Sequence, residues 1–392
     1  MDQFEWPKSF TTSSYGTVTD APASAPKESR AKAATTSRGS FASFVCHVVN
    51  LERKLRSFSP LVLDNSSNVR VTGKILGQGK TFMVRHAQWV RNPREPQLDV
   101  ALKEIITDVQ ASDDNSSSNR GHRSQSDWKD ILFEIRALLH EPIRYHPNLV
   151  RLLGIQWGLS PISESTYPVL IMEYASLGTF NTLQASSEPL SFAVKQKLCY
   201  DVGRALSALH ACGIVHGDMK HENVLIFLSK KPIGGVQYTA KLADFGGTVM
   251  DMTSDEFREM ETWTWPFQAP EISSRKPLTR NGMMLTDIYS FGLLVWRAFM
   301  DGEGFVSFDG AAQTASDEDK QSLSARKASE DFTNTAIADI YAYARRRGFS
   351  QSCIDVIVYT ILHTVRLKPE DRDLVNAQAA LRGIKYEQAF SH

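Results

Sequence analysis

Cysteine is scarce in this sequence. Four of the 392 residues are cysteine, at Cys46, Cys199, Cys212 and Cys353. None of them forms a C-x-x-C pair or has histidine companions at metal-ligand spacing, which argues against a zinc site and against a thioredoxin-like redox motif. A chain of this length also buries enough surface to fold without a disulfide framework. We therefore expect a protein of a reducing, intracellular compartment.

Long apolar runs and an excess of charge of either sign are also missing. No stretch approaches the ~20 apolar residues that cross a bilayer, and the segment that begins at Met1 lacks the features of a secretory signal. Lys and Arg together number 44, as do Asp and Glu, so the formal net charge is +0. This balance indicates no nucleic-acid or anionic-membrane partner. We expect a soluble protein of the cytoplasm or nucleus, with no membrane span.

Large aliphatic side chains are scarce in residues 1–40, which are rich in Ser, Thr, Ala and Pro. Such a segment cannot bury enough apolar surface to offset the entropy of ordering, so we expect a disordered tail. In residues 41–58, apolar residues recur at helical spacing and predict an amphipathic helix, followed by a linker to residue 68. Its apolar stripe either packs back on its own domain, which we favour, or contacts a partner or a membrane surface. The tail and this helix are the candidates for partner contacts.

The most informative stretch is a polar run, His216–Asn223, that lies directly before the apolar residues 224–227. It contains Asp218, Lys220 and Asn223 in the pattern H-x-D-x-K-x-x-N. A carboxylate can accept a proton, an ammonium can stabilise a phosphate, and an amide carbonyl can ligand a metal, so the three together suit phosphoryl transfer. The alternative interpretation is a solvated polar loop before a strand.

This polar run resembles the catalytic loop of eukaryotic protein kinases, H-R-D-L-K-x-x-N. Gly217 and Met219 stand where the family usually has Arg and Leu. The family's arginine commonly pairs with a phosphate on the activation segment, and Gly217 cannot make that pair. We therefore expect an activity that does not depend on phosphorylation of the activation segment through this position.

A glycine-containing turn upstream adds a second motif. Gly77 and Gly79 lie between two strand-like segments, where the lack of a Cβ lets backbone amides approach phosphates. The G-K-T run at 79–81 also resembles part of a G-x-x-x-x-G-K-T phosphate loop, but the first glycine of that loop is absent and no helix follows. The kinase loop G-x-G-x-x-G-x-V resembles the segment better, with Val84 in place and Phe82 where the third glycine stands.

The remaining parts of the kinase pattern follow in order. The apolar strand Asp99–Ile105 resembles V-A-I-K and carries Lys103, and the expected helix 127–139 carries Glu134. We assign Glu134, in preference to Glu141, as the partner of Lys103. Further matches are a hinge strand at 169–175, D-F-G at 244–246, Thr264 of the activation segment, A-P-E at 269–271, an apolar helix that begins at Asp287, and Arg372 as the partner of Glu271.

The resemblance implies an α+β protein of two lobes with ATP between them. The smaller lobe would hold an antiparallel sheet with one helix, and the larger lobe would be mainly helical. The protein kinase domain is expected over residues 69–385, with lobes of about 69–173 and 174–385. Two polar segments, about 108–127 and 301–335, are expected to be insertions.

The resemblance also implies the site residues and their roles. Asp218 would take the proton of the acceptor hydroxyl and Lys220 would stabilise charge during transfer, while Asn223 and Asp244 would hold Mg²⁺. The implied ATP-binding residues are Gly77, Gly79, Val84, Ala101, Lys103, Glu134, Met172, Glu173, Ala175 and Leu225. A stack of Leu138, Leu152, His216 and Phe245 is implied as the hydrophobic spine.

The function implied is transfer of the γ-phosphate of ATP to Ser and Thr hydroxyls of protein substrates, with ATP and Mg²⁺ bound. Lys220 favours Ser and Thr acceptors over Tyr. The alternative is a pseudokinase scaffold, suggested by Phe82 in the glycine loop and by Trp263 and Trp265 around Thr264. An enzyme that phosphorylates small molecules fits less well, because the A-P-E element and the helix after it resemble the protein-directed branch.

Overall fold

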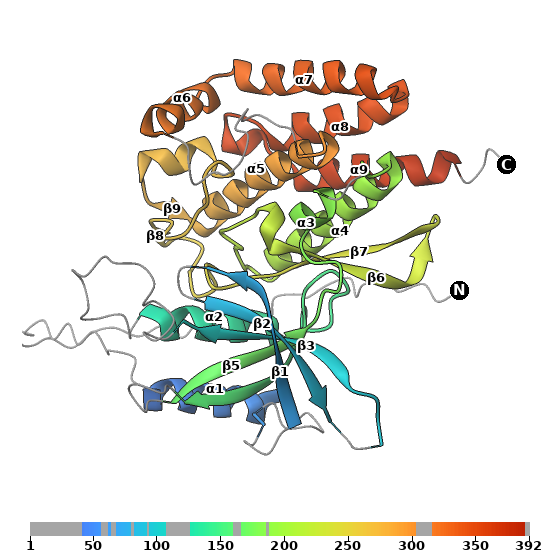
Figure 1. Ribbon diagram of the computed structural model, residues 1–392. Coiled ribbons are helices and arrows are strands. Elements are labelled where there is room, and N and C mark those ends of the chain that lie inside the picture. Colours follow the sequence, from blue (N-terminus) through green and yellow to red (C-terminus); the bar gives the residue numbers. More distant parts are fainter. Residues whose placement is uncertain are drawn as a thin grey trace, which may run out of the picture. The chain divides into compact units, whose positions relative to one another are not determined.

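The computed structural model describes residues 41–55, 62–63, 68–79, 82–91, 94–106, 126–159, 166–185, 188–302 and 316–388 (Figure 1). Residues 39–392 form one compact unit, which carries every element below. The expected tail over 1–40, most of the expected insertion over 108–127 and residues 303–315 lie outside the described residues. Within the described ranges we find no helix with the length and apolarity that a bilayer crossing requires. All four cysteines are free thiols.

The amino-terminal lobe is built on a five-stranded antiparallel sheet, as expected. Its spatial strand order is β1-β2-β3-β5-β4. The strands are β1 (Asn68–Gln78), β2 (Phe82–Val90), β3 (Leu98–Ile105), β4 (Leu152–Leu159) and β5 (Thr166–Glu173). The glycine turn connects β1 to β2, and the pairing of these two strands shifts register near Ile75.

The register of the central strands decides which side chains share a face of this sheet. Val84 of β2 pairs with Lys103 of β3, and Ala101 of β3 pairs with Met172 of β5. Residues that pair across an antiparallel ladder share a face, as do residues two apart on one strand. All four side chains therefore line one face, which borders a cleft. Leu102 points to the opposite face, where it is buried.

Helix α2 (Ser126–Leu138) is the helix expected over 127–139. Ile131, Ile135 and Leu138 recur at helical spacing and are all buried. This apolar face packs into the main core of the protein. Glu134 lies among these apolar side chains and is only 1% exposed, so its carboxylate requires a partner.

Helix α1 (Phe41–Leu55) packs its apolar stripe on its own lobe, beside α2 (Figure 1). Phe44 and Val48 lie one turn apart and are buried in the same core cluster as Ile135. After the helix, residues 62–63 pair with β4. The first of the two expected roles, packing back on its own domain, is therefore the one that the structure contains.

The carboxyl-terminal lobe is mainly helical. Its helices are α3 (Phe180–Gln184), α4 (Phe192–Ala211), α5 (Arg280–Phe299), α6 (Asp317–Lys327), α7 (Asp331–Arg347), α8 (Gln351–Thr364) and α9 (Leu374–Gln388). Helix α5 is the most deeply buried, because even the large side chains of Tyr289, Phe291 and Trp296 are at most 1% exposed. Helices α4 and α8 pack against it, so α5 is a rigid support at the centre of the lobe (Figure 1).

A hairpin of β6 (Val224–Ile233) and β7 (Val236–Leu242) follows the polar run directly. Its turn is Gly234-Gly235, with φ of 57° and 75°, the left-handed values that a two-residue hairpin turn requires. Val224 pairs with Leu242 at the open end of the hairpin. The next residue, Ala243, therefore lies beside the polar run, and its N–H donates to Asn223 O at 2.9 Å. The hairpin thus places D-F-G beside the expected catalytic loop.

The remaining short elements are the strands β8 (Phe257–Arg258) and β9 (Leu278–Thr279) and the 3₁₀ turns His221–Asn223, Pro270–Ser274 and Pro369–Asp371.

One sequence expectation for this lobe needs correction, and the structure adds a helix to the segment covered by another. The apolar helix expected to begin at Asp287 is α5, which begins at Arg280, where Thr279 caps it by accepting a hydrogen bond from Gly282 N. Its first three residues, Arg280–Gly282, are polar or glycine, so the hydrophobic pattern starts at Met283, and the motif matched in the sequence begins further along the helix, at Asp287. The segment expected only as an insertion over 301–335 contains helix α6, which has few apolar residues and therefore a weak helical pattern.

Candidate active site

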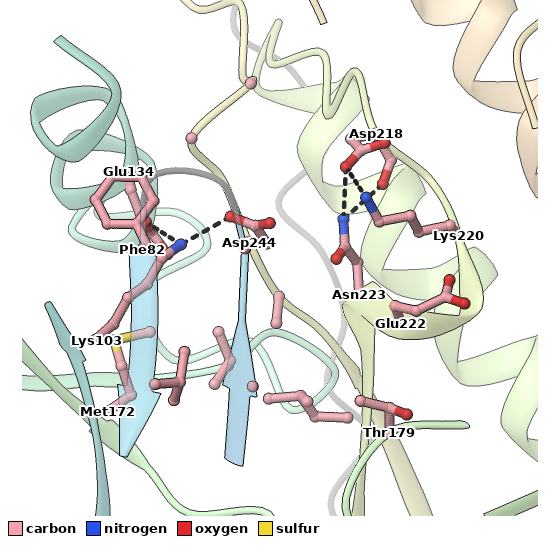
Figure 2. A pocket seen from close by; sticks show the side chains of 18 of the residues that line it. Phe82, Lys103, Glu134, Met172, Thr179, Asp218, Lys220, Glu222, Asn223 and Asp244 are labelled. Atoms are coloured by element: carbon pink, nitrogen blue, oxygen red, sulfur yellow. Dashed lines mark hydrogen bonds and ion pairs between the residues drawn. The ribbon is translucent and has the colours of Figure 1, made fainter. Parts of the chain in front are cut away.

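A cleft of about 1380 Å³ lies at the face of the sheet that carries Lys103, and the polar run lines it as well. Figure 2 shows Lys103 and Asp244 pointing toward one another from one side, and Asp218, Lys220 and Asn223 grouped on the other. The cleft therefore brings together side chains that lie far apart in the sequence.

Lys103 lies between two carboxylates. Its Nζ is 2.7 Å from Glu134 Oε2 and 2.7 Å from Asp244 Oδ1 (Figure 2). Burial disfavours the charged form of Lys103, but the carboxylates of Asp244 and Glu134 outweigh it and raise the pKa of the amine. Lys103 is therefore a fixed cation, held in place by α2. Glu141, the rejected alternative, is exposed and lies 3.8 Å from Arg144 instead.

The Asp244 carboxyl is more acidic than an ordinary aspartate. The Lys103 ammonium lowers the pKa of Asp244 to about 2, against the opposing effect of desolvation. Its backbone has φ of 64°, in the left-handed region that Asp tolerates better than most residues. Burial raises the pKa of the Glu134 carboxyl, and the Lys103 ammonium counteracts this effect. Asp244, which is about half exposed to the cleft, is thus the carboxylate available to a cation.

Asp218 is held by donors on both of its oxygens. Lys220 Nζ lies 2.5 Å from Oδ2, and the Thr264 hydroxyl donates to Oδ1 at 2.6 Å. Lys220 Nζ also donates to Thr264 Oγ1 at 2.9 Å, which closes a triangle. Asn223 Nδ2 donates to the Asp218 carbonyl at 2.8 Å and to Oδ2 at 3.1 Å. The side-chain amide nitrogen of Asn223 is thus engaged, and the side-chain amide oxygen is the atom left for a metal.

The backbone of the polar run is fixed by Asp287 of α5. Its carboxylate accepts hydrogen bonds from His216 N at 2.8 Å and Gly217 N at 2.9 Å. Gly217 has φ of 82°, and a Cβ there would lie 2.8 Å from Gly247 O. Glycine is therefore favoured by both its conformation and the close approach of the segment that follows D-F-G.

The hydrophobic spine expected from the resemblance is present as a set of buried side chains. His216 and Phe245 face one another with ring centroids 5.3 Å apart. Leu138 and Leu152 are buried in the same core cluster as Phe245. The spine links α2, β4 and both halves of the site through apolar packing.

Several apolar side chains line the cleft. They come from both lobes and are Val84, Ala101, Met172, Ala175 and Leu225. The side chain of Glu173 is engaged elsewhere, because its Oε1 accepts from Arg151 N at 2.9 Å and from Lys241 Nζ at 2.6 Å. The backbone N–H of Glu173 also donates to Arg151 O at 3.1 Å, so its backbone carbonyl is the group that the resemblance leaves for a ligand.

The glycine turn lies over this cleft. Among the described residues, an added Cβ would meet nothing within 4 Å at Gly77, and only Phe82 O, at 3.7 Å, at Gly79. Packing within the described part of the chain therefore does not require these glycines, which fits a cradle kept open for a ligand. The Phe82 ring lies over Lys103, with Nζ 4.9 Å from its centroid. An aromatic side chain therefore covers the lysine where the kinase pattern has a glycine (Figure 2).

Two interactions near the site have no counterpart among the sequence predictions. Arg136 at the end of α2 forms a two-pronged pair with Asp251 of the segment after D-F-G. His221, inside the polar run, is fully buried between Phe180 and Phe267, and burial holds the pKa of its imidazole well below the ordinary value. No local signal announces either of them, because the partners are distant in sequence.

The expected pair of Glu271 and Arg372 is present. Arg372 Nη1 and Nη2 donate to the two oxygens of Glu271 at 2.5 and 2.9 Å. The Arg372 side chain is 0% exposed, and it also donates to the carbonyl oxygens of Leu285 and Arg366. This ion pair joins the end of the activation segment to the 3₁₀ turn before α9.

The oxygen donors of the site suit a magnesium ion. No cluster of three or more His, Cys, Asp and Glu that could hold a metal by itself occurs in the described ranges. Mg²⁺ is usually bound by one or two carboxylates with waters and substrate phosphates. The Asp244 carboxylate and the Asn223 amide oxygen fit that kind of site.

Known protein kinases resemble this chain in sequence. A family model described as "Protein kinase domain" matches residues 71–375. In Arabidopsis thaliana, the serine/threonine/tyrosine-protein kinase HT1 is 29% identical over 155 residues, 39% of this chain and 35% of that protein. The probable serine/threonine-protein kinase PBL16 from the same plant is 30% identical over 190 residues, 46% of this chain and 40% of that protein.

A third relative comes from Dictyostelium discoideum. The dual specificity protein kinase zakA is 27% identical over 164 residues, 39% of this chain and 20% of that protein. The matched part of this chain thus spans less than half the length of each of these three relatives.

Proposed function

Because the chain belongs to the protein kinase family, we propose that it transfers the γ-phosphate of ATP to Ser and Thr hydroxyls of protein substrates. The observation that carries this proposal is the triangle of Asp218, Lys220 and Thr264, whose three sides are hydrogen bonds of 2.5 to 2.9 Å. A general base must be held in one orientation beside the proton that it accepts. The triangle orients the Asp218 carboxylate in that way.

Each half of the cleft has a separate task. Asp218 would accept the proton of the acceptor hydroxyl, and Lys220 would stabilise the negative charge that develops on the transferred phosphoryl group. Lys103 would bind the α and β phosphates, since Glu134 and Asp244 keep it charged and in place. The apolar lining, with Val84 and Met172, would bind the adenine.

Asn223 and Asp244 would hold Mg²⁺ through oxygen atoms. The ion, when bound, neutralises phosphate charge. Because the Asp244 pKa is lowered to about 2, its carboxylate is ionised at any physiological pH and needs no proton loss to bind a cation.

Ser and Thr acceptors are favoured over Tyr by the contact between Lys220 and Thr264, at 2.9 Å. A lysine at this position, bonded to a threonine of the activation segment, is the arrangement that the Ser/Thr-directed pattern implies. The names of two of the relatives above include tyrosine or dual specificity, so phosphotyrosine is the product to measure beside phosphoserine and phosphothreonine.

Phe82 supports the alternative function, a pseudokinase scaffold. Its ring covers Lys103 at 4.9 Å, in the space that phosphates would enter. If the ring is not displaced, the cleft would bind adenosine-like ligands or partners without phosphate transfer.

A direct assay separates the two functions. Purified protein is incubated with Mg-ATP labelled on the γ-phosphate, alone and with casein as a generic acceptor, and nucleotide binding is followed by thermal shift. We expect labelled serine and threonine in the protein itself or in casein. Stabilisation by nucleotide with no label in any acceptor would instead favour the scaffold.

The domain boundaries belong to the same proposal. We propose that residues 69–385 form the catalytic domain, that residues 1–40 are a tail, and that 108–127 and 301–335 are insertions, the second of which includes helix α6. The tail is also the remaining candidate for partner contacts, since α1 packs on its own lobe.

Phosphatase treatment should leave most of the activity intact. Arg136 and Asp251 already join α2 to the segment after D-F-G through a carboxylate, and Gly217 offers no cation to a phosphate there. We therefore expect similar initial rates before and after treatment with a broad-specificity phosphatase, with removal of phosphate checked by mass spectrometry. A rate that falls severalfold, and that recovers on autophosphorylation, would contradict this expectation.

A further inference from the structure

A buried lysine outside the cleft contacts the activation segment. Lys327 is the last residue of α6 (Asp317–Lys327) and is only 3% exposed. Its Nζ donates to the carbonyl oxygen of Pro266 and, at 2.9 Å, to that of Gln268. Burial of an ammonium is costly unless strong acceptors compensate. Most residues of this helix are polar, and a buried lysine is unusual in such a helix.

The carbonyl groups that Lys327 binds belong to the loop that leads away from Thr264. Phe267 N–H donates back to Thr264 O at 2.8 Å, and the Ser290 hydroxyl of α5 donates to Phe267 O at 2.8 Å. Three consecutive carbonyl groups, from Pro266 to Gln268, are therefore held by side chains of α6 and α5. Thr264 is joined to this loop through its backbone carbonyl group.

Lys327 also lies close to the ion pair of Arg372 and Glu271, with the Tyr289 ring near both cations. The Tyr289 ring of α5 lies 5.7 Å from Lys327 Nζ and 4.8 Å from the guanidinium of Arg372. Arg372 in turn binds Glu271. Burial lowers the pKa of Lys327 to about 7.

We propose that Lys327 is a positioning residue for the protein acceptor, because it fixes the loop that connects Thr264, a hydrogen-bond partner of Asp218, to Glu271. This inference rests on the proposed kinase function. Lys327 touches neither ATP nor the acceptor hydroxyl; it acts through the loop. Its loss should therefore affect the binding of the acceptor more than the binding of ATP.

The experiment compares Lys327→Met, which keeps the length and removes the donor, with Lys327→Gln, which keeps a neutral donor. Lys320→Met on the exposed side of α6 is the matched control, because its ammonium only pairs with Asp317 at 3.2 Å. For Lys327→Met we expect the KM for casein to rise about tenfold or more, since a loosened loop misplaces the acceptor. The KM for ATP should change little, and Lys327→Gln should be intermediate.

Hydrogen exchange gives a second readout that does not require activity. We expect faster exchange of the backbone amides of 264–269 in Lys327→Met, with unchanged exchange in α4, and no change in Lys320→Met. Equal changes in both KM values, or a loss of kcat and thermal stability without a change at 264–269, would overturn the proposal. If the wild type transfers no phosphate, the kinase function fails, but unchanged exchange at 264–269 would still overturn the anchor by itself.

Discussion

Replacing Asp218 with asparagine should lower phosphate transfer by about 10²- to 10⁴-fold, the usual contribution of a general base, and leave nucleotide binding intact. Asparagine can still accept from the Thr264 hydroxyl, but its amide nitrogen then faces Lys220 Nζ, which now lies 2.5 Å from an oxygen. The variant therefore loses the base and also disturbs the triangle. Label incorporation from γ-labelled ATP measures the rate, and thermal shift with ADP measures the remaining binding.

The control is the same substitution at an exposed aspartate outside the cleft, Asp355. Asp355 lies on α8, on the exposed side of the helix, where its Oδ1 accepts from Gln351 Nε2 at 2.7 Å. Asp355→Asn should transfer phosphate at the wild-type rate. If Asp218→Asn retained a rate within a few fold of the wild type, Asp218 would not be the base, and the assignment of the polar run as the catalytic loop would be wrong.

Replacing Arg372 with leucine should lower the free energy of unfolding by about 3–5 kcal/mol, the cost of removing one partner of a buried ion pair. The Arg372 side chain is 0% exposed and Glu271 17% exposed. The carbonyl groups of Leu285 and Arg366 would lose a donor as well. Urea unfolding followed by circular dichroism measures the change.

The neighbouring arginine provides the comparison. Arg366 is 36% exposed and lies 3.9 Å from Asp371, so Arg366→Leu should change stability by less than about 1 kcal/mol, as expected for a surface pair. A loss for Arg372→Leu as small as that of Arg366→Leu would show that the buried pair contributes little. Glu271→Gln should be destabilising too, since it leaves the Arg372 cation buried without its counter-ion.

The parts of the site that could be predicted are those whose chemistry is local in sequence. Asp218, Lys220 and Asn223 share one short run, so their types and spacing already indicated phosphoryl transfer. The pairing of Lys103 with Glu134 needed the family resemblance, because residue types alone also allowed Glu141. The structure separates the two glutamates by burial, since only Glu134 lies on the apolar face of α2.

The parts that could not be predicted depend on partners that are remote in sequence. Arg136 and Asp251 are 115 positions apart, and Lys327 and Pro266 are 61 positions apart. A charged residue that binds backbone carbonyl groups leaves no pattern in the sequence, because any residue can supply a carbonyl. The start of α5 was missed for a different reason, since the matched motif begins at Asp287, in the middle of the helix, although Met283 of the first turn is already buried.

The contacts of α1 show that the region of family likeness and the unit that unfolds together are not the same length. The family match begins at residue 71, whereas the buried side chains of Phe44 and Val48 belong to one core cluster with Ile135 of α2. A polypeptide cut at the family boundary would expose the apolar surface under α1, on the helix that carries Glu134. Recombinant fragments and sequence comparisons that begin at residue 71 would thus omit α1. Helix α1 packs on α2, which holds Glu134 next to Lys103.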